Sequence, residues 1–167
     1  MNFQETLIQP GGKYGFLSAK DRTFLLRFTE AITARGFGVF AVDNTMFVYA
    51  RGTDRTKNVA ARIYLGGGTL TLRMYFRDVA KHQAYIKAAP DYIRDVFLGH
   101  EGDCAHCGNE RDGSCRYRKE YEIGGVTYGK CGGWAFTFGH PDMERLDDYL
   151  GIFDEFYPAK KRIKTIF

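Results

Sequence analysis

The sequence predicts a single α+β domain over residues 1–167, with a mostly antiparallel sheet of about seven short strands and about four helices. Short runs of alternating apolar residues are joined by glycine or Asp-Asn turns, a pattern typical of β-hairpins. Between them lie segments whose apolar residues recur at helical spacing. The chain has 167 residues, of which 44% are hydrophobic, so its length and composition suit one domain with one core.

The first half of the chain is expected to form a helix followed by two hairpins. Apolar residues recur at helical spacing over about 21–35, and Asp21 is placed to cap the start of that helix. The strand-like runs FGVFAV and TMFVYA are separated by Asp43-Asn44, which indicates the first hairpin. A second hairpin is expected from strands at 60–65 and 69–76, because three glycines join them.

The second half is expected to form three helices and a three-stranded meander. One helix covers about 78–88, and a short helix starts at Pro90, because proline fits the first helical turn. A hairpin turns at Gly124-Gly125, and the aromatic run at 134–138 adds a third strand beside it. The last helix begins at Pro141 and extends to about residue 156.

The segment 104–131 holds all four cysteines of the chain, in the order C-x2-C-x7-C-x15-C. Two thiolates at C-x2-C spacing can bind one ion from a tight turn, and four thiolates complete the tetrahedral shell of zinc. The expected hairpin returns the last cysteine to a place beside the third. Because a closed shell has a structural role, a structural zinc site is expected in the subregion 100–131. Its ligands would be Cys104, Cys107, Cys115 and Cys131.

Two other uses of these cysteines remain open. They are either free thiols packed as small hydrophobic residues, or a redox or disulfide set. The C-x2-C pair lies among Gly, Asn, Glu and Asp, which is the composition of a loop and not of the helix start at which redox pairs lie. His100 could replace one cysteine as a ligand. Four basic residues can either balance the charge of a thiolate cluster or form part of an anion-binding face: Arg111, Arg116, Arg118 and Lys130.

The hairpin around the three glycines predicts a second candidate site, on the face of the sheet. Arginine and tyrosine together can bind nucleic-acid phosphates and bases, or an anionic aromatic ligand. The alternative is a half-exposed face on which arginine only stacks on tyrosine. Four residues at alternating strand positions are expected to share this face: Arg62, Tyr64, Arg73 and Tyr75.

Two basic segments give a third candidate site, for contact with nucleic acid. The net charge of the chain is +4, and part of it gathers in a loop and in the C-terminal tail. A solvated loop and a solvated chain end are the alternatives. The residues are Arg51, Arg55 and Lys57 in the loop, and Lys160, Lys161, Arg162 and Lys164 in the tail.

The cysteine segment resembles that of a group of small uncharacterised bacterial proteins. Their pattern is a C-x2-C pair, then R-x-x-Y-x-I-x-G-x-x-Y-x-x-C, then an aromatic strand. The matching residues here are Cys104, Cys107, Arg118, Tyr121, Ile123, Gly125, Tyr128 and Cys131, followed by Trp134, Phe136 and Phe138. The group has no assigned activity, so the resemblance implies no function. It does favour a cysteine set that acts together.

The sequence favours a cytoplasmic binding protein over other classes. Its N-terminus lacks the basic start and apolar run of a signal peptide, and no stretch reaches the ~18 apolar residues of a membrane span. Motifs of nucleophile-and-base enzymes are absent. The expected function is a non-enzymatic binding module with one structural zinc, whose ligand and oligomeric state stay open. A nucleic-acid-binding protein using the basic loop and tail, and an enzyme whose pocket the sequence does not reveal, are the alternatives.

Overall fold

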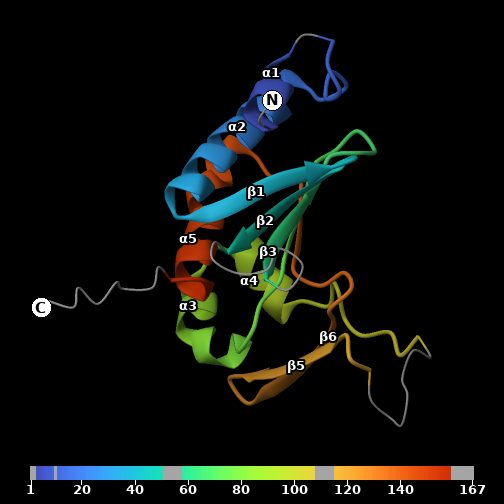
Figure 1. The fold of residues 1–167 in the computed structure, drawn as a ribbon. Coiled ribbons are helices and arrows are strands. Elements are labelled where there is room, and N and C mark those ends of the chain that lie inside the picture. Colours follow the sequence, from blue (N-terminus) through green and yellow to red (C-terminus); the bar gives the residue numbers. More distant parts are fainter. Residues whose placement is uncertain (1–2, 10, 51–57, 108–114, 159–167) are drawn as a thin grey trace, which may run out of the picture.

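In the computed structural model, the described residues are 3–9, 11–50, 58–107 and 115–158, and they form five α-helices and seven strands (Figure 1). The helices are α1 (Phe3–Ile8), α2 (Ala19–Ala34), α3 (Gln83–Ala88), α4 (Asp91–Leu98) and α5 (Leu146–Phe156), with 3-10 turns η1 (Val79–His82) and η2 (Met143–Arg145). The strands are β1 (Phe37–Val42), β2 (Thr45–Ala50), β3 (Val59–Tyr64), β4 (Thr71–Met74), β5 (Arg118–Ile123), β6 (Val126–Cys131) and β7 (Thr137–Gly139). The expected α+β class is confirmed, and α1 is a helix that the sequence did not predict.

Five strands form one antiparallel sheet in the order β1-β2-β3-β4-β7, and β5 and β6 form a separate hairpin at the lower end of the molecule in Figure 1. The meander expected at 134–138 is wrong, because β7 pairs with β4 and not with β6. The φ of Phe136 is +57°, so the strand begins only at the next residue. Phe136 and Phe138 are each 4% exposed, and the Phe136 ring lies 5.0 Å from that of Phe76 in the main core. Burial of these two rings against the large sheet thus decides which sheet the strand joins.

The core lies on one face of the large sheet, which the helices cover (Figure 1). Phe153 of α5 packs edge-on against Phe28 of α2, with ring centroids 5.9 Å apart, and against Phe37 of β1 at 5.3 Å. The strand residues that point to this side are buried, among them Met46, Val48, Ile63, Leu72 and Met74. Because strand residues alternate, the others on the same strands lie on the opposite face.

Four helix starts differ from those expected. The last helix, expected from Pro141, begins with η2 at Met143 and continues as α5 from Leu146. α2 follows Ser18, whose Oγ accepts a hydrogen bond from the backbone N of Asp21 at 3.0 Å. Asp21 therefore lies in the first turn, where its charge still favours the helix N-terminus. The helix expected at 78–88 is divided into η1 and α3. Pro90 is the residue before α4 and not the first in it.

Candidate functional site

The β5–β6 hairpin brings the last two cysteines together. Gly124 and Gly125 both have positive φ, as a two-residue hairpin turn requires, so the turn expected there is confirmed. The register places Cys131 opposite Arg118. The backbone N of Arg118 donates a hydrogen bond to the carbonyl of Cys115 at 3.1 Å, so Cys115 lies at the same end of the hairpin.

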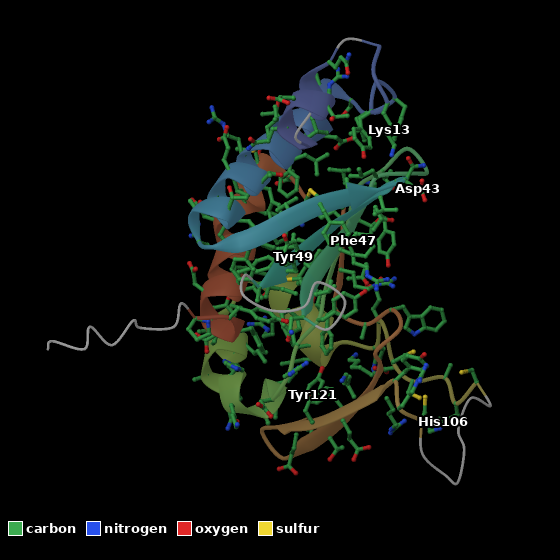
Figure 2. All side chains as sticks on the ribbon, in the orientation of Figure 1. Lys13, Asp43, Phe47, Tyr49, His106 and Tyr121 are labelled. Carbon is green, nitrogen blue, oxygen red and sulfur yellow. The ribbon has the colours of Figure 1, made fainter. Side chains whose placement is uncertain are left out.

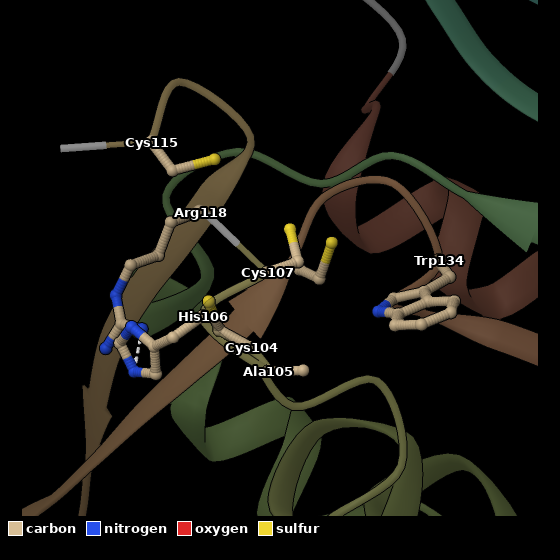
Figure 3. Close-up of a pocket in the computed structure, with 8 residues that line it drawn as sticks. Cys104, Ala105, His106, Cys107, Cys115, Arg118 and Trp134 are labelled. Atoms are coloured by element: carbon tan, nitrogen blue, oxygen red, sulfur yellow. Dashed lines mark hydrogen bonds between the residues drawn. The ribbon is translucent and has the colours of Figure 1, made fainter. Parts of the chain in front are cut away.

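The first two cysteines are joined to the same end of the hairpin by backbone hydrogen bonds. The N of Cys104 donates to the carbonyl of Gly129 at 2.9 Å, and the N of Cys131 donates to the carbonyl of Gly102 at 2.8 Å. We call residues 102–107, 115–118 and 129–134 the cysteine knuckle. One pocket of the knuckle is lined by all four cysteines, together with Ala105, His106, Arg118 and Trp134 (Figure 3).

The pocket gathers four thiols, but it does not by itself show a metal site. Within the parts of the chain that the structure describes, no three Cys, His, Asp or Glu side chains are arranged to hold an ion. All four cysteines are free of disulfide bonds. His100, the possible substitute ligand, does not line the pocket, because its side chain is exposed and contacts Asp103 at 3.1 Å.

Positive charge lies beside the thiols of the pocket. A hydrogen bond to the sulfur of Cys104 is the main cause that raises the pKa of Arg118, and Glu120 adds to it. His106 Nε2 lies 3.4 Å from a guanidinium nitrogen of Arg118 (Figure 3). Figure 2 shows His106 at the outer end of this part of the molecule. A guanidinium at this place can offset part of the negative charge that metal-bound thiolates carry.

The buried side chain of Lys130 stabilises the cysteine knuckle by hydrogen bonds, a role that the sequence did not predict. Its side chain is 0% exposed. Its Nζ donates hydrogen bonds to the carbonyl of Glu101 at 3.0 Å, to Oδ1 of Asp103 at 2.7 Å, and to the carbonyl of Gly99. The hydrogen bond from Lys130 is the main cause that lowers the pKa of Asp103. Lys130 was expected to balance thiolate charge or to form part of an anion-binding face, but it holds the chain that leads into Cys104.

The open face of the large sheet carries a row of residues that crosses all five strands. The register aligns Arg62 on β3 directly with Arg73 on β4, as expected from the sequence. Tyr64 and Tyr75 are not opposite each other, and each lies diagonally beside an arginine. The complete row is Phe40, Phe47, Arg62, Arg73 and Thr137. Figure 2 labels Phe47 on this sheet.

Both arginines of the row are held in place by their neighbours. The guanidinium carbon of Arg62 lies 5.0 Å from the ring centroid of Phe47 and 5.6 Å from that of Tyr75. Its Nε is buried and has no hydrogen-bond partner among the described residues. Burial is the main cause that raises the pKa of the neighbouring Tyr75.

Arg73 is fixed more tightly, and by the knuckle itself. Its guanidinium lies 5.1 Å from the ring centroid of Tyr64 and donates hydrogen bonds to Oγ1 of Thr137 at 3.2 Å and to the carbonyl of Gly133 at 2.5 Å. Because Gly133 belongs to the knuckle, one hydrogen bond joins the cysteine pocket to the row on the sheet.

Neither arginine has an acidic partner in the described part of the chain. The ion pairs found there do not include Arg62 or Arg73. In contrast, four other arginines each contact a carboxylate, namely Arg27, Arg35, Arg94 and Arg118. Two half-buried guanidinium groups on one face therefore have no carboxylate partner among the residues that the structure describes.

Trp134 lies between the two candidate sites. It lines the cysteine pocket (Figure 3), and it also lines a smaller hollow with Phe136 and Thr137. Its carbonyl accepts a hydrogen bond from Oγ1 of Thr137 at 2.8 Å, and its N donates to the carbonyl of Cys131 at 3.1 Å. Its side chain is nevertheless 56% exposed, so a large apolar ring faces solvent at the end of the row.

The remaining candidate residues fall outside the described residues. They are the basic loop with Arg51, Arg55 and Lys57, the tail with Lys160, Lys161, Arg162 and Lys164, and Arg111 of the cysteine segment. Among the residues that the structure does describe, no helix is both long and apolar enough to cross a membrane. Comparisons with protein-family models, curated proteins and solved structures found no match to this chain.

Proposed function

We propose that this protein is a non-enzymatic, cytoplasmic binding module that binds an anionic, ring-bearing ligand on the open face of its large sheet. In this proposal, zinc held by Cys104, Cys107, Cys115 and Cys131 has a structural role and keeps the cysteine knuckle against that face. Four cysteines that line one pocket and form no disulfide bond suit a reducing compartment.

The zinc part of the proposal is supported by the chemistry of the donor set. Four thiols that are distant in sequence line one pocket, and backbone hydrogen bonds join the segments that carry them. Four thiolates leave no open coordination position, so the ion would stabilise the fold and not activate water. Arg118 beside the Cys104 sulfur offsets part of the negative charge of such a cluster.

The single observation that carries the ligand part is the pair of arginines, Arg62 and Arg73, for which the described residues provide no carboxylate partner. Removing a guanidinium from water is unfavourable unless an opposite charge or hydrogen bonds replace its hydration. Arg62 has only rings beside it, and its Nε has no partner in the described part of the chain. An anion placed over the row would supply the missing charge and acceptor atoms.

The neighbours of the arginines add a preference for a flat ligand. Tyr64, Tyr75 and Phe47 surround the two guanidinium groups, and rings of this kind bind the face of a planar group. The contacts of the arginines are rings, the hydroxyls of Thr137 and Tyr64, and the carbonyl of Gly133, without a general base among the described residues. This favours binding over catalysis.

We expect Arg62→Gln and Arg73→Gln each to weaken binding of adenosine monophosphate about 10- to 100-fold. Each replacement removes a positive charge that would donate hydrogen bonds to the phosphate of the ligand. Isothermal titration of the full chain with adenosine monophosphate, adenosine and inorganic phosphate measures this. The monophosphate should bind more tightly than either fragment, since only it offers both charge and ring.

The matched control is Arg27→Gln. Arg27 is an exposed arginine of α2 that pairs with Glu30 at 3.2 Å, away from the sheet face. Its replacement should leave the affinity unchanged. Equal affinities of all three variants and the parent protein for the monophosphate would contradict a ligand site at the row.

A further inference from the structure

We infer that the ligand of the open face is single-stranded nucleic acid, which runs across the strands over Arg62 and Arg73 and stacks a base on Trp134. The inference rests on the proposed function and names the ligand class of the same face. Its phosphates would meet the two guanidinium groups, and Trp134 would be the stacking ring at the end of the row.

The first argument is the extent of the face. From Phe47 on β2 to Thr137 on β7 the row makes three strand steps, which at about 4.8 Å each amounts to about 14 Å. Trp134 continues the row, because its carbonyl accepts the hydroxyl of Thr137. A surface of this extent exceeds what one mononucleotide covers. It matches the two or three bases that RNA-binding sheets stack with their aromatic residues.

The second argument is the charge of the face. The register gives the residues of β1–β4 and β7 that share the side of the row: Gly38, Phe40, Val42, Thr45, Phe47, Tyr49, Arg62, Tyr64, Thr71, Arg73 and Thr137. None of them is Asp or Glu. A phosphodiester chain therefore meets two guanidinium groups and no carboxylate along the row, which is the electrostatic footprint of backbone binding.

The third argument is the exposure of Trp134. A tryptophan ring that is 56% exposed leaves a large apolar surface in water, although Phe136 two residues later is buried. The carbonyl of Trp134 accepts a hydrogen bond from the hydroxyl of Thr137, and the carbonyl of the preceding Gly133 accepts one from Arg73, so the backbone that carries the ring is joined to the row. Exposed rings next to cationic groups are the usual platform for unpaired bases.

The same features select a single strand over a duplex. The faces of bases in a duplex are covered by their neighbours, so stacking on Trp134 requires an unpaired base. Reading a duplex through its major groove takes a helix or a two-stranded ribbon that fits the groove, and this face is a broad sheet.

Titration of the full-length chain with the homopolymers dT12 and rU12 tests the inference. The sequence contains one tryptophan, so the intrinsic tryptophan fluorescence reports Trp134 alone. Binding of either oligonucleotide should quench it. With oligonucleotides of increasing length, affinity should rise from three nucleotides upward and then reach a plateau. A plot of log Kd against log salt should have a slope of about 1.4 in magnitude, about 0.7 for each of two phosphates contacted.

Variants are compared by the anisotropy of a fluorescein-labelled dT12, since Trp134→Ala removes the intrinsic signal. Trp134→Ala should weaken binding about 5- to 150-fold, the range for loss of one stacked base. Trp134→Phe should recover most of it. The control is Phe16→Ala, because Phe16 is a similarly exposed ring, 53%, in the segment between α1 and α2.

Four results would overturn the inference. One is equal affinity for dT12 and for its duplex with dA12. Another is an unchanged affinity of Trp134→Ala protein that is folded by circular dichroism. The third is binding of adenosine monophosphate without binding of either oligonucleotide, which would leave the proposed function standing and make the ligand a small anion. Absence of binding by the oligonucleotides and by the monophosphate would remove both proposals.

Discussion

Cys104→Ser and Cys131→Ser proteins are each expected to lose several kcal/mol of unfolding free energy or to fail to fold, because the binding energy of a structural metal is folding energy. The parent protein, purified without chelator, is expected to contain about one zinc per chain. Its four thiols should react slowly with a thiol reagent until a chelator is added. Elemental analysis, thiol titration and urea denaturation measure the three quantities.

Ala105→Ser is the control for this experiment. It introduces the same hydroxyl at an exposed position of the knuckle, between the two first cysteines, without removing a thiol. Its stability and zinc content should equal those of the parent. A zinc-free parent protein with four reactive thiols, and a Cys104→Ser protein of unchanged melting temperature, would together rule out the zinc site.

Lys130→Met is expected to lower the unfolding free energy by about 1 to 3 kcal/mol, the range for leaving a buried hydrogen-bonding group without its partner. Methionine keeps the apolar stem but removes the ammonium group. The carbonyls of Gly99 and Glu101 and the carboxylate of Asp103 would then lose their donor. Urea denaturation, monitored by circular dichroism, gives the difference.

Lys119→Met is the matched control, because Lys119 is the cross-strand partner of Lys130 and its side chain is exposed. Both variants replace a lysine by methionine in the same hairpin. The difference between their unfolding free energies therefore measures the effect of burying the lysine. The role assigned to Lys130 would be wrong if the two proteins unfolded at the same urea concentration.

Local turn chemistry made much of this fold predictable. Gly124-Gly125 forms the turn of the β5–β6 hairpin, and Asp43, with a φ of +50°, lies in the turn between β1 and β2. Strand alternation also placed Arg62 beside Arg73, because a hairpin fixes which residues oppose each other. These features depend on short segments, which carry their own signals in the sequence.

Features set by distant contacts were not predictable. Strand β7 was expected beside β6, but it pairs with β4, and Phe136 and Phe138 are buried there. The sequence near β7 does not indicate which strand it pairs with. Lys130 was expected to balance thiolate charge or to form part of an anion-binding face, and its burial was not predictable, since its three acceptors come from residues 99–103, about thirty positions earlier. The exposure of Trp134 was equally hidden, because an aromatic run suggests a core strand.

The pairing of β4 with β7 has a consequence for the order in which the chain folds. Thr71 pairs with Gly139, so the large sheet is complete only after a long loop closes. The whole cysteine knuckle lies inside that loop. A metal bound there would shorten the loop before its ends meet, which lowers the entropy lost on closure and speeds folding. Stopped-flow refolding is therefore expected to be faster with stoichiometric zinc than with chelator. The ion would then speed the assembly of the large sheet, although the segment that binds it contributes no strand to that sheet.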